Sequence, residues 1–197
     1  MTQLSRNAQL LKYFAQQYPG IPRTRLVKLV YMSDVLARQY LGHPISTFRY
    51  VHHYFGPYDG AVESAAEELE AAGLARQEFD RGPELTYKRL HDNGTPTPFS
   101  FTLGENEVLA YVSANYVQMP MREFLDDVVY ETLPMKLSER RQAPLEMSVL
   151  DHTGSKAVGF DLERVLRAEQ QAESGNYKTL RTFGDELRAA IAARHTT

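Results

Sequence analysis

The side chains best suited to chemistry in this sequence are the histidines. His52 and His53 are adjacent, and His91 precedes Asp92 further along the chain. A metal ion or an acid–base reaction would need such groups on one side of the backbone, but adjacent residues of a strand point to opposite faces. The sequence has no His-x-x-x-His spacing, and the lack of cysteine removes thiolate ligands. We therefore predict no metal site.

Motifs for nucleophilic catalysis and phosphate binding are also missing. Ser5, Ser33, Ser46 and Ser64 lie outside any Gly-x-Ser-x-Gly sequence, and no Gly-x-Gly loop is present. The sequence therefore predicts that the protein is not an enzyme and needs no cofactor.

Side chains suited to recognition gather in the first third of the chain. Lys28 and Tyr31 share one face of an expected helix, and Asp34 lies a further turn along it. A partner could contact all three side chains. An internal network, with Tyr31 packed and Lys28 or Asp34 paired with the next helix, explains the same spacing equally well.

A short aromatic segment, residues 54–58, follows that helix. Gly56 permits a backbone conformation closed to other residues, and Pro57 fixes the next φ angle. Tyrosines held in this way lose little entropy on binding. Alternatively, Gly56 and Pro57 only form the turn between two packed helices. The predicted partner-binding residues are Lys28, Tyr31, Asp34, Tyr54, Gly56, Pro57 and Tyr58.

Hydrophobic periodicity predicts three helices and a hairpin in the first half of the chain. Pro22 suits the first turn of the second helix, and Gly42 and Gly73 suit the ends of the second and third. The third helix is rich in glutamate, which is typical of a solvated face and would also attract a basic partner. The expected elements are helices over residues 4–15, 22–40 and 59–72, an extended or irregular connection over 45–55, and a hairpin over 74–90.

The second half of the chain predicts further helices and a linker. Thr102 and Glu105 form a capping box before one helix, and Pro120 separates it from another. The sequence predicts a mainly helical α+β fold with a small β-hairpin. Its parts are a domain over residues 1–136, a linker over 137–159 and a helical appendage over 160–197.

Composition limits the class of protein. A chain of 197 residues can bury one core, or a main domain with a smaller appendage. The chain has no long apolar run, and its first residues lack the order of a signal peptide, so we expect no membrane span and a cytoplasmic protein. A net charge of −3 argues against coating nucleic acid without regard to sequence.

DNA binding by a winged-helix module is the alternative function. Three helices followed by a hairpin is the order of such a module, and basic residues such as Arg25, Arg76 and Lys88 lie on the second helix and the expected wing. The third helix, which would read the DNA, is acidic and would repel phosphates. We therefore place DNA binding second.

Four segments of the first third together resemble the Panacea domain of SocA-like antitoxins. That family has a Lys-Leu-Leu-Tyr-like helix, a Gly followed by Pro or a basic residue, and a Tyr-Gly-Pro motif that opens an acidic helix. The resemblance is strong over residues 21–74 and extends to 134. The matching segments are residues 24–34, 40–45, 50 and 54–58.

This resemblance implies an antitoxin of a prokaryotic or phage toxin–antitoxin system. Such a protein neutralises a toxin encoded by an adjacent gene through direct protein contact. In one arrangement of the family, the antitoxin also delivers the toxin to an ATP-dependent protease. The toxins paired with this domain look chemically unrelated to each other, so the resemblance implies no particular toxin.

Overall fold

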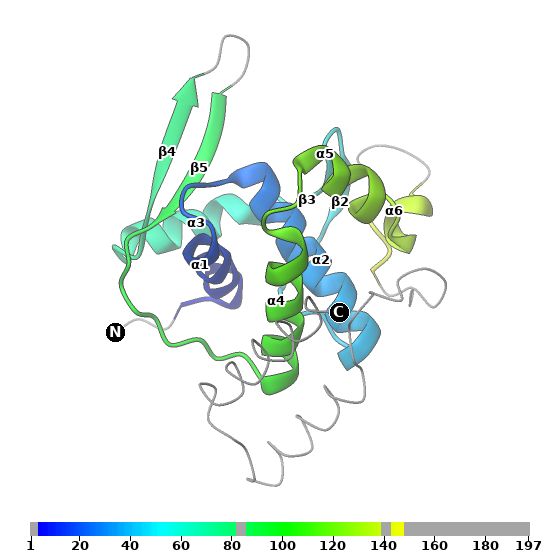
Figure 1. The fold of residues 1–197 in the computed structure, drawn as a ribbon, viewed down its shortest axis with the longest axis horizontal. Helices are drawn as coiled ribbons and strands as arrows, with labels where there is room; N and C mark the ends of the chain where they lie inside the picture. The colour runs from blue at the N-terminus through cyan, green and yellow to red at the C-terminus, as the bar shows by residue number, and fades with distance from the viewer. Residues whose placement is uncertain (1–3, 82–85, 139–142, 148–197) are drawn as a thin grey trace, which may run out of the picture.

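The structure is a computed structural model that describes residues 4–81, 86–138 and 143–147. Helices form the body of the molecule, and one hairpin extends away from it (Figure 1). In chain order the elements are α1 (Arg6–Gln17), β1 (Ile21–Pro22), α2 (Arg23–Leu41), β2 (Val51–His53), β3 (Gly56–Tyr58), α3 (Ala61–Ala71), β4 (Ala75–Arg81), β5 (Thr86–Asp92), α4 (Leu103–Tyr116), α5 (Met121–Glu123), the π-helical turn η1 (Phe124–Val129) and α6 (Leu133–Lys136).

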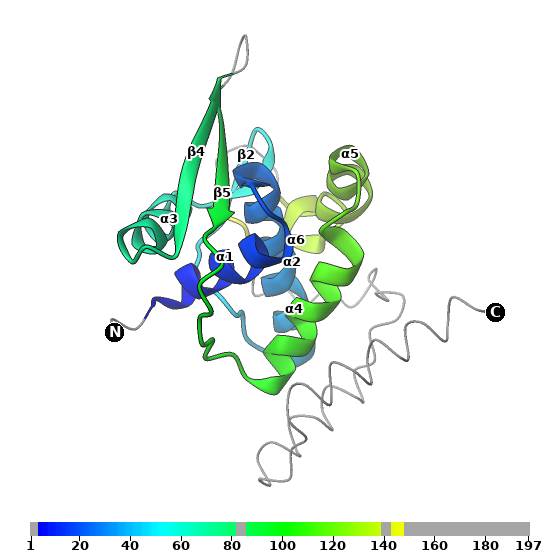
Figure 2. The same cartoon turned by 60° about the vertical axis from the view of Figure 1, so that its left-hand side comes forward.

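Helix α2 lies at the centre of the body. Every residue from Arg25 to Ala37 is buried, because α1 and α4 pack against different sides of the helix (Figure 2). The helix ends where Gly42 adopts a φ angle of +81°, the left-handed conformation expected of a helix stop. A helix enclosed in this way must bury its polar side chains along with its apolar ones.

The main sheet has three antiparallel strands in the order β1-β5-β4. The predicted hairpin is confirmed as β4 and β5, and the two-residue β1 pairs Ile21 with Leu90. Pro22 was predicted in the first turn of the second helix, but it pairs with Arg89 in this sheet, and the helix begins at Arg23. Apart from hairpin β2–β3, which lies between α2 and α3, the order of a helix, a strand, two helices and two strands is that of a winged-helix module.

Between α2 and α3 the chain makes a loop and a second hairpin, β2–β3. The connection predicted to be extended or irregular thus contains one short strand. Part of the predicted linker also lies here, because Pro144 pairs with Val51 and the backbone N–H of Leu145 donates to the carbonyl of Tyr50 at 2.9 Å. Residues 143–147 therefore pack on the domain that precedes them.

The helices after the sheet complete the body. The capping box before α4 is confirmed, with the Thr102 hydroxyl accepting from the Glu105 backbone and the Glu105 carboxylate accepting from the Thr102 backbone. Helix α4 packs along α2, and the chain then turns at Pro120 into α5, η1 and α6.

The fold is mainly helical α+β, as predicted. The predicted appendage over residues 160–197 lies outside the described residues. Within the described part of the chain, no helix combines the length and apolar character needed to cross a membrane.

Candidate functional site

The aromatic segment predicted to bind a partner forms the turn of hairpin β2–β3. The strands pair His53 with Gly56, which leaves Tyr54 and Phe55 between them. Tyr54 is 60 % exposed and Phe55 is 57 % exposed, so the hairpin presents two aromatic rings to solvent. We call these two residues the aromatic tip.

Gly56 lets the hairpin lie close to the helical body. Its φ angle is +85°, in a region that glycine enters without the steric cost of a side chain. A Cβ atom at this position would stand 3.4 Å from Cε of Lys28 and 3.5 Å from Cε1 of Tyr130. A Cβ atom would thus be in ordinary van der Waals contact, and it is the positive φ angle that favours glycine beside the aromatic tip.

Lys28 holds the base of the hairpin from the core. Its side chain is 2 % exposed, and its Nζ donates a hydrogen bond of 2.8 Å to the backbone carbonyl of Pro57 in β3. Burial favours the neutral amine and lowers the pKa of Lys28 to about 7. A neutral amine can still donate this bond, so the contact does not require a charge.

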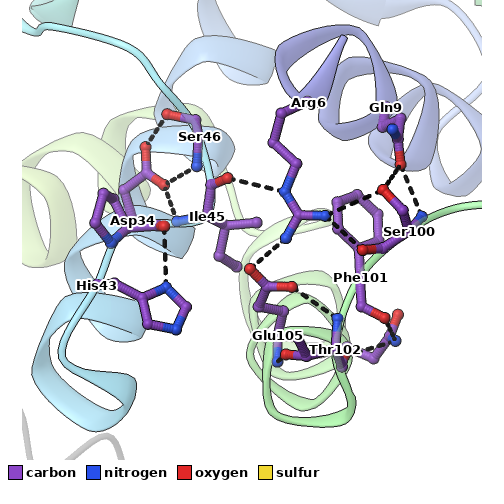
Figure 3. Close-up of polar contacts among 12 residues, drawn as sticks. Arg6, Gln9, Asp34, His43, Ile45, Ser46, Ser100, Phe101, Thr102 and Glu105 are labelled. Atoms are coloured by element: carbon purple, nitrogen blue, oxygen red, sulfur yellow. Dashed lines mark hydrogen bonds and ion pairs between the residues drawn. The ribbon is translucent and has the colours of Figure 1, made fainter. Parts of the chain in front are cut away.

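Asp34 holds the loop between α2 and the hairpin. Its carboxylate accepts bonds of 2.8 Å from the backbone N–H groups of Ile45 and Ser46, as well as a bond from the Ser46 hydroxyl (Figure 3). The hydroxyl of Tyr50 donates a further bond of 2.7 Å. Burial raises the pKa of the Asp34 carboxyl, while the hydrogen bonds from these residues oppose the rise.

The same loop is linked to two further helices (Figure 3). Arg6 of α1 donates to the carbonyl of Ile45 at 3.2 Å and to the carbonyl of Ser100 at 2.7 Å. Its guanidinium also forms an ion pair with Glu105 at the start of α4. Polar contacts therefore connect α2, the loop, α1 and α4 in sequence.

Tyr31 connects α2 to the segment before α6. Its fully buried hydroxyl lies 2.7 Å from Oγ1 of Thr132, and Thr132 in turn donates to the carbonyl of Val129 at 2.7 Å. The Tyr31 ring also packs edge to face on the ring of Tyr50, with centroids 5.1 Å apart. Tyr31 and Asp34 therefore both contact Tyr50.

The structure places Lys28, Tyr31 and Asp34 inside the protein, where a partner cannot touch them directly. Of the two interpretations of their spacing, the internal network is the one found. Their bonding partners, however, are the hairpin backbone, Thr132 and the loop, rather than charged groups of the next helix. We call these three the anchoring residues.

The other predicted site residues lie in the hairpin itself. Tyr54 is exposed, Gly56 and Pro57 are buried, and Tyr58 is half-buried with its ring 5.4 Å from that of His53. Phe55 was not predicted as a site residue, although its position beside Tyr54 in the turn was a usable signal.

The histidines and the glutamate-rich helix have internal partners. His52 lies 2.9 Å from the Ser138 hydroxyl, and the described residues contain no cluster suited to a metal ion. In α3, Glu63 pairs with Arg23 and Lys88. Two more carboxylates of α3, those of Glu68 and Glu70, accept from Ser5 and Gln77. Much of the predicted acidic face is therefore used within the protein.

The arrangement as a whole presents a fixed aromatic surface supported by buried polar contacts. Such a surface is suited to binding another protein. No protein-family model, curated protein or solved structure matches the chain. The residue pattern and this geometry are therefore the basis on which a function is proposed.

Replacing Asp34 with alanine is expected to destabilise the fold. The substitution leaves the donors of Ile45, Ser46 and Tyr50 buried without an acceptor, and each such group costs about 1–3 kcal/mol. We expect urea unfolding to show a loss of at least ~3 kcal/mol. Asp127→Ala removes an exposed carboxylate and should cost less than ~0.5 kcal/mol. Equal losses in the two variants would contradict the role of Asp34.

The buried Lys28 amine is expected to make stability rise with pH above neutrality. Between pH 7 and the ordinary lysine pKa of 10.5, the folded amine is mostly neutral while the unfolded amine binds a proton, so protons favour unfolding. From pH 7 to pH 9 the free energy of unfolding should rise by about 2 kcal/mol more in the parent than in Lys28→Met. Urea unfolding at both pH values measures this difference, and equal pH dependence in the two proteins would contradict it.

Proposed function

We propose that the protein is a cytoplasmic antitoxin that neutralises a cognate toxin by direct protein contact, with the aromatic tip at the centre of the contact. The observation that carries this proposal is the exposure of Tyr54 and Phe55 on a hairpin whose backbone is bonded to the buried Lys28. Large aromatic side chains contribute strongly to protein interfaces, and fixed ones lose little entropy on binding.

The resemblance to the Panacea domain supports the same function. Its Lys-Leu-Leu-Tyr-like helix and its Tyr-Gly-Pro motif correspond here to segments that touch each other, through the bond from Lys28 to Pro57. In this chain the helix motif thus supports the hairpin motif. Delivery of the bound toxin to an ATP-dependent protease is a finer part of the proposal, which a faster decay of the toxin in the presence of this chain would support.

Neutralisation should depend on the aromatic tip. In cells induced for the protein encoded by the adjacent gene, we expect the parent chain to restore growth and to co-purify with that protein. The double variant Tyr54→Ala/Phe55→Ala should lose both effects while keeping the parent's circular dichroism and melting temperature, because exposed side chains contribute little to folding.

Phe79→Ala provides the matched control for this experiment. Phe79 is also an aromatic side chain, 57 % exposed, but it lies on β4 of the other hairpin. This variant should protect as well as the parent. Full protection by the double variant would show that the aromatic tip is not the contact. A harmless neighbouring protein that does not co-purify would remove the proposal of neutralisation.

DNA binding is the second candidate because the sheet order β1-β5-β4 matches that of a winged-helix module. Helix α3 would be its reading helix, yet Glu67 and Glu70 are exposed there, and Glu63 pairs with Arg23 and Lys88. These carboxylates oppose phosphates and neutralise cations that would otherwise attract them.

A mobility-shift assay separates the two candidates. We expect no shift of the DNA upstream of the gene even at about 50 mM salt, where nonspecific contacts with phosphates are strong. A shift that weakens steeply as salt increases would favour DNA binding instead. The same preparation must co-purify with the neighbouring protein, which shows that the chain tested is active.

A further inference from the structure

Hairpin β2–β3, which carries the aromatic tip, lies on the same side of the helical body as α5 and α6 (Figure 1). Tyr130, directly after η1, lies against Gly56, where an added Cβ atom would stand 3.5 Å from its ring. Ser138, after α6, bonds the ring of His52 at 2.9 Å. The segment from 121 to 138 therefore flanks the hairpin on the protein surface.

Exposed apolar side chains are concentrated on this side. Among the described residues, four large apolar side chains are more than half exposed, and three of them are Tyr54, Phe55 and Leu137, the last 53 % exposed. Leu137 is adjacent to Ser138 and therefore close to β2. Three of these four side chains are therefore carried by two segments in contact, hairpin β2–β3 and the end of α6, and exposed apolar groups gathered in this way are typical of a protein-binding site.

The π-helical turn η1 exposes carboxylates on this segment. Phe124 and Val129 are both fully buried, although residues five apart would lie about 140° apart around an α-helix. The wider turn, in which the Tyr130 N–H donates to the Leu125 carbonyl at 2.9 Å, brings both side chains to the core. Asp126 and Asp127, between them, are then exposed to solvent.

Four exposed carboxylates form what we call the acidic flank: Glu123, Asp126, Asp127 and Glu131. Two of them have a cation nearby, since Asp126 lies 3.5 Å from Arg122 and Glu131 lies 2.6 Å from Lys136. Glu123 and Asp127 form no ion pair with any residue that the structure describes. Among the described residues, two carboxylates of the flank therefore lack a cationic partner, and they lie on the segment that flanks the hairpin.

We propose that the aromatic tip and the acidic flank together bind a cationic amphipathic segment of the partner protein. This inference rests on the proposed function and specifies the chemistry of the toxin surface. Apolar side chains on one face of the segment would cover Tyr54, Phe55 and Leu137, and lysine or arginine beside them would meet Glu123 and Asp127. Anionic lipid and nucleic acid carry the wrong charge for this surface.

Two synthetic peptides test the inference on the full chain without knowledge of the toxin. One is an 18-residue amphipathic helix of leucine and lysine, and the other replaces each lysine with glutamate. We expect fluorescence anisotropy to detect binding of the lysine peptide, weakened by salt, and no binding of the glutamate peptide.

Charge reversal locates the binding surface. Glu123→Lys/Asp127→Lys should weaken the affinity for the lysine peptide roughly tenfold, because two attractions become repulsions. Tyr54→Ala/Phe55→Ala should weaken this affinity at least as much. Glu67→Lys, which reverses one exposed charge on α3, is the control and should change the dissociation constant of the lysine peptide less than twofold.

Three outcomes would overturn the inference: no binding of the lysine peptide, equal binding of the glutamate peptide, or an equal loss in Glu67→Lys and in the single variant Glu123→Lys. None of these outcomes bears on the separate proposal that the protein neutralises a toxin in cells. Conversely, selective binding of the lysine peptide without growth rescue would retain the surface and reject the antitoxin function.

Discussion

The polar side chains buried on α2 are the constraint on which the surrounding structure depends. A buried donor or acceptor without a partner costs more than a typical hydrogen bond contributes, so Lys28, Tyr31 and Asp34 must each be satisfied from within. Each of them bonds a different segment outside the helix: the hairpin, the residue before α6 and the loop after α2. One helix thus positions the hairpin, the loop and the start of α6.

This arrangement separates the residues that shape the surface from those that form it. The anchoring residues are close to fully buried, whereas the aromatic tip projects into solvent from the hairpin that Lys28 and Gly56 support. A substitution in the core would move the hairpin and weaken binding indirectly, together with stability. A substitution at Tyr54 or Phe55 would remove contact area and leave the support in place.

Negative charge has two different roles in the protein. On α3, Glu63, Glu68 and Glu70 bond neighbouring elements, so their charges are largely used in holding the helix to the sheet and to the start of α1. On the acidic flank, Glu123 and Asp127 have no such partner among the described residues. Sequence composition counts these charges alike, although the first group is bonded within the protein and the second has no cationic partner among the described residues.

The sequence by itself determined helices α1 to α4, the β4–β5 hairpin, the capping box at Thr102 and the mainly helical α+β class, whereas the single helix expected after Pro120 is α5, a π-helical turn and a separate α6. These features depend on periodicity and on local cap and turn residues, which are encoded within a few positions. The sequence also indicated that α2 and the segment around Gly56 contain the residues of a candidate recognition site. Only the tertiary structure decided which of those side chains face the core.

The reason is the distance in sequence between the groups that meet. The bond from Tyr31 to Thr132 spans 101 residues, and no local pattern encodes it. The spacing of the anchoring residues fits an exposed face and an enclosed helix equally, and the choice depends on whether α1 and α4 cover α2. Burial is a property of the assembled chain. Only the tertiary structure therefore showed that the side chains of α2 support the hairpin and that the aromatic tip is exposed to solvent.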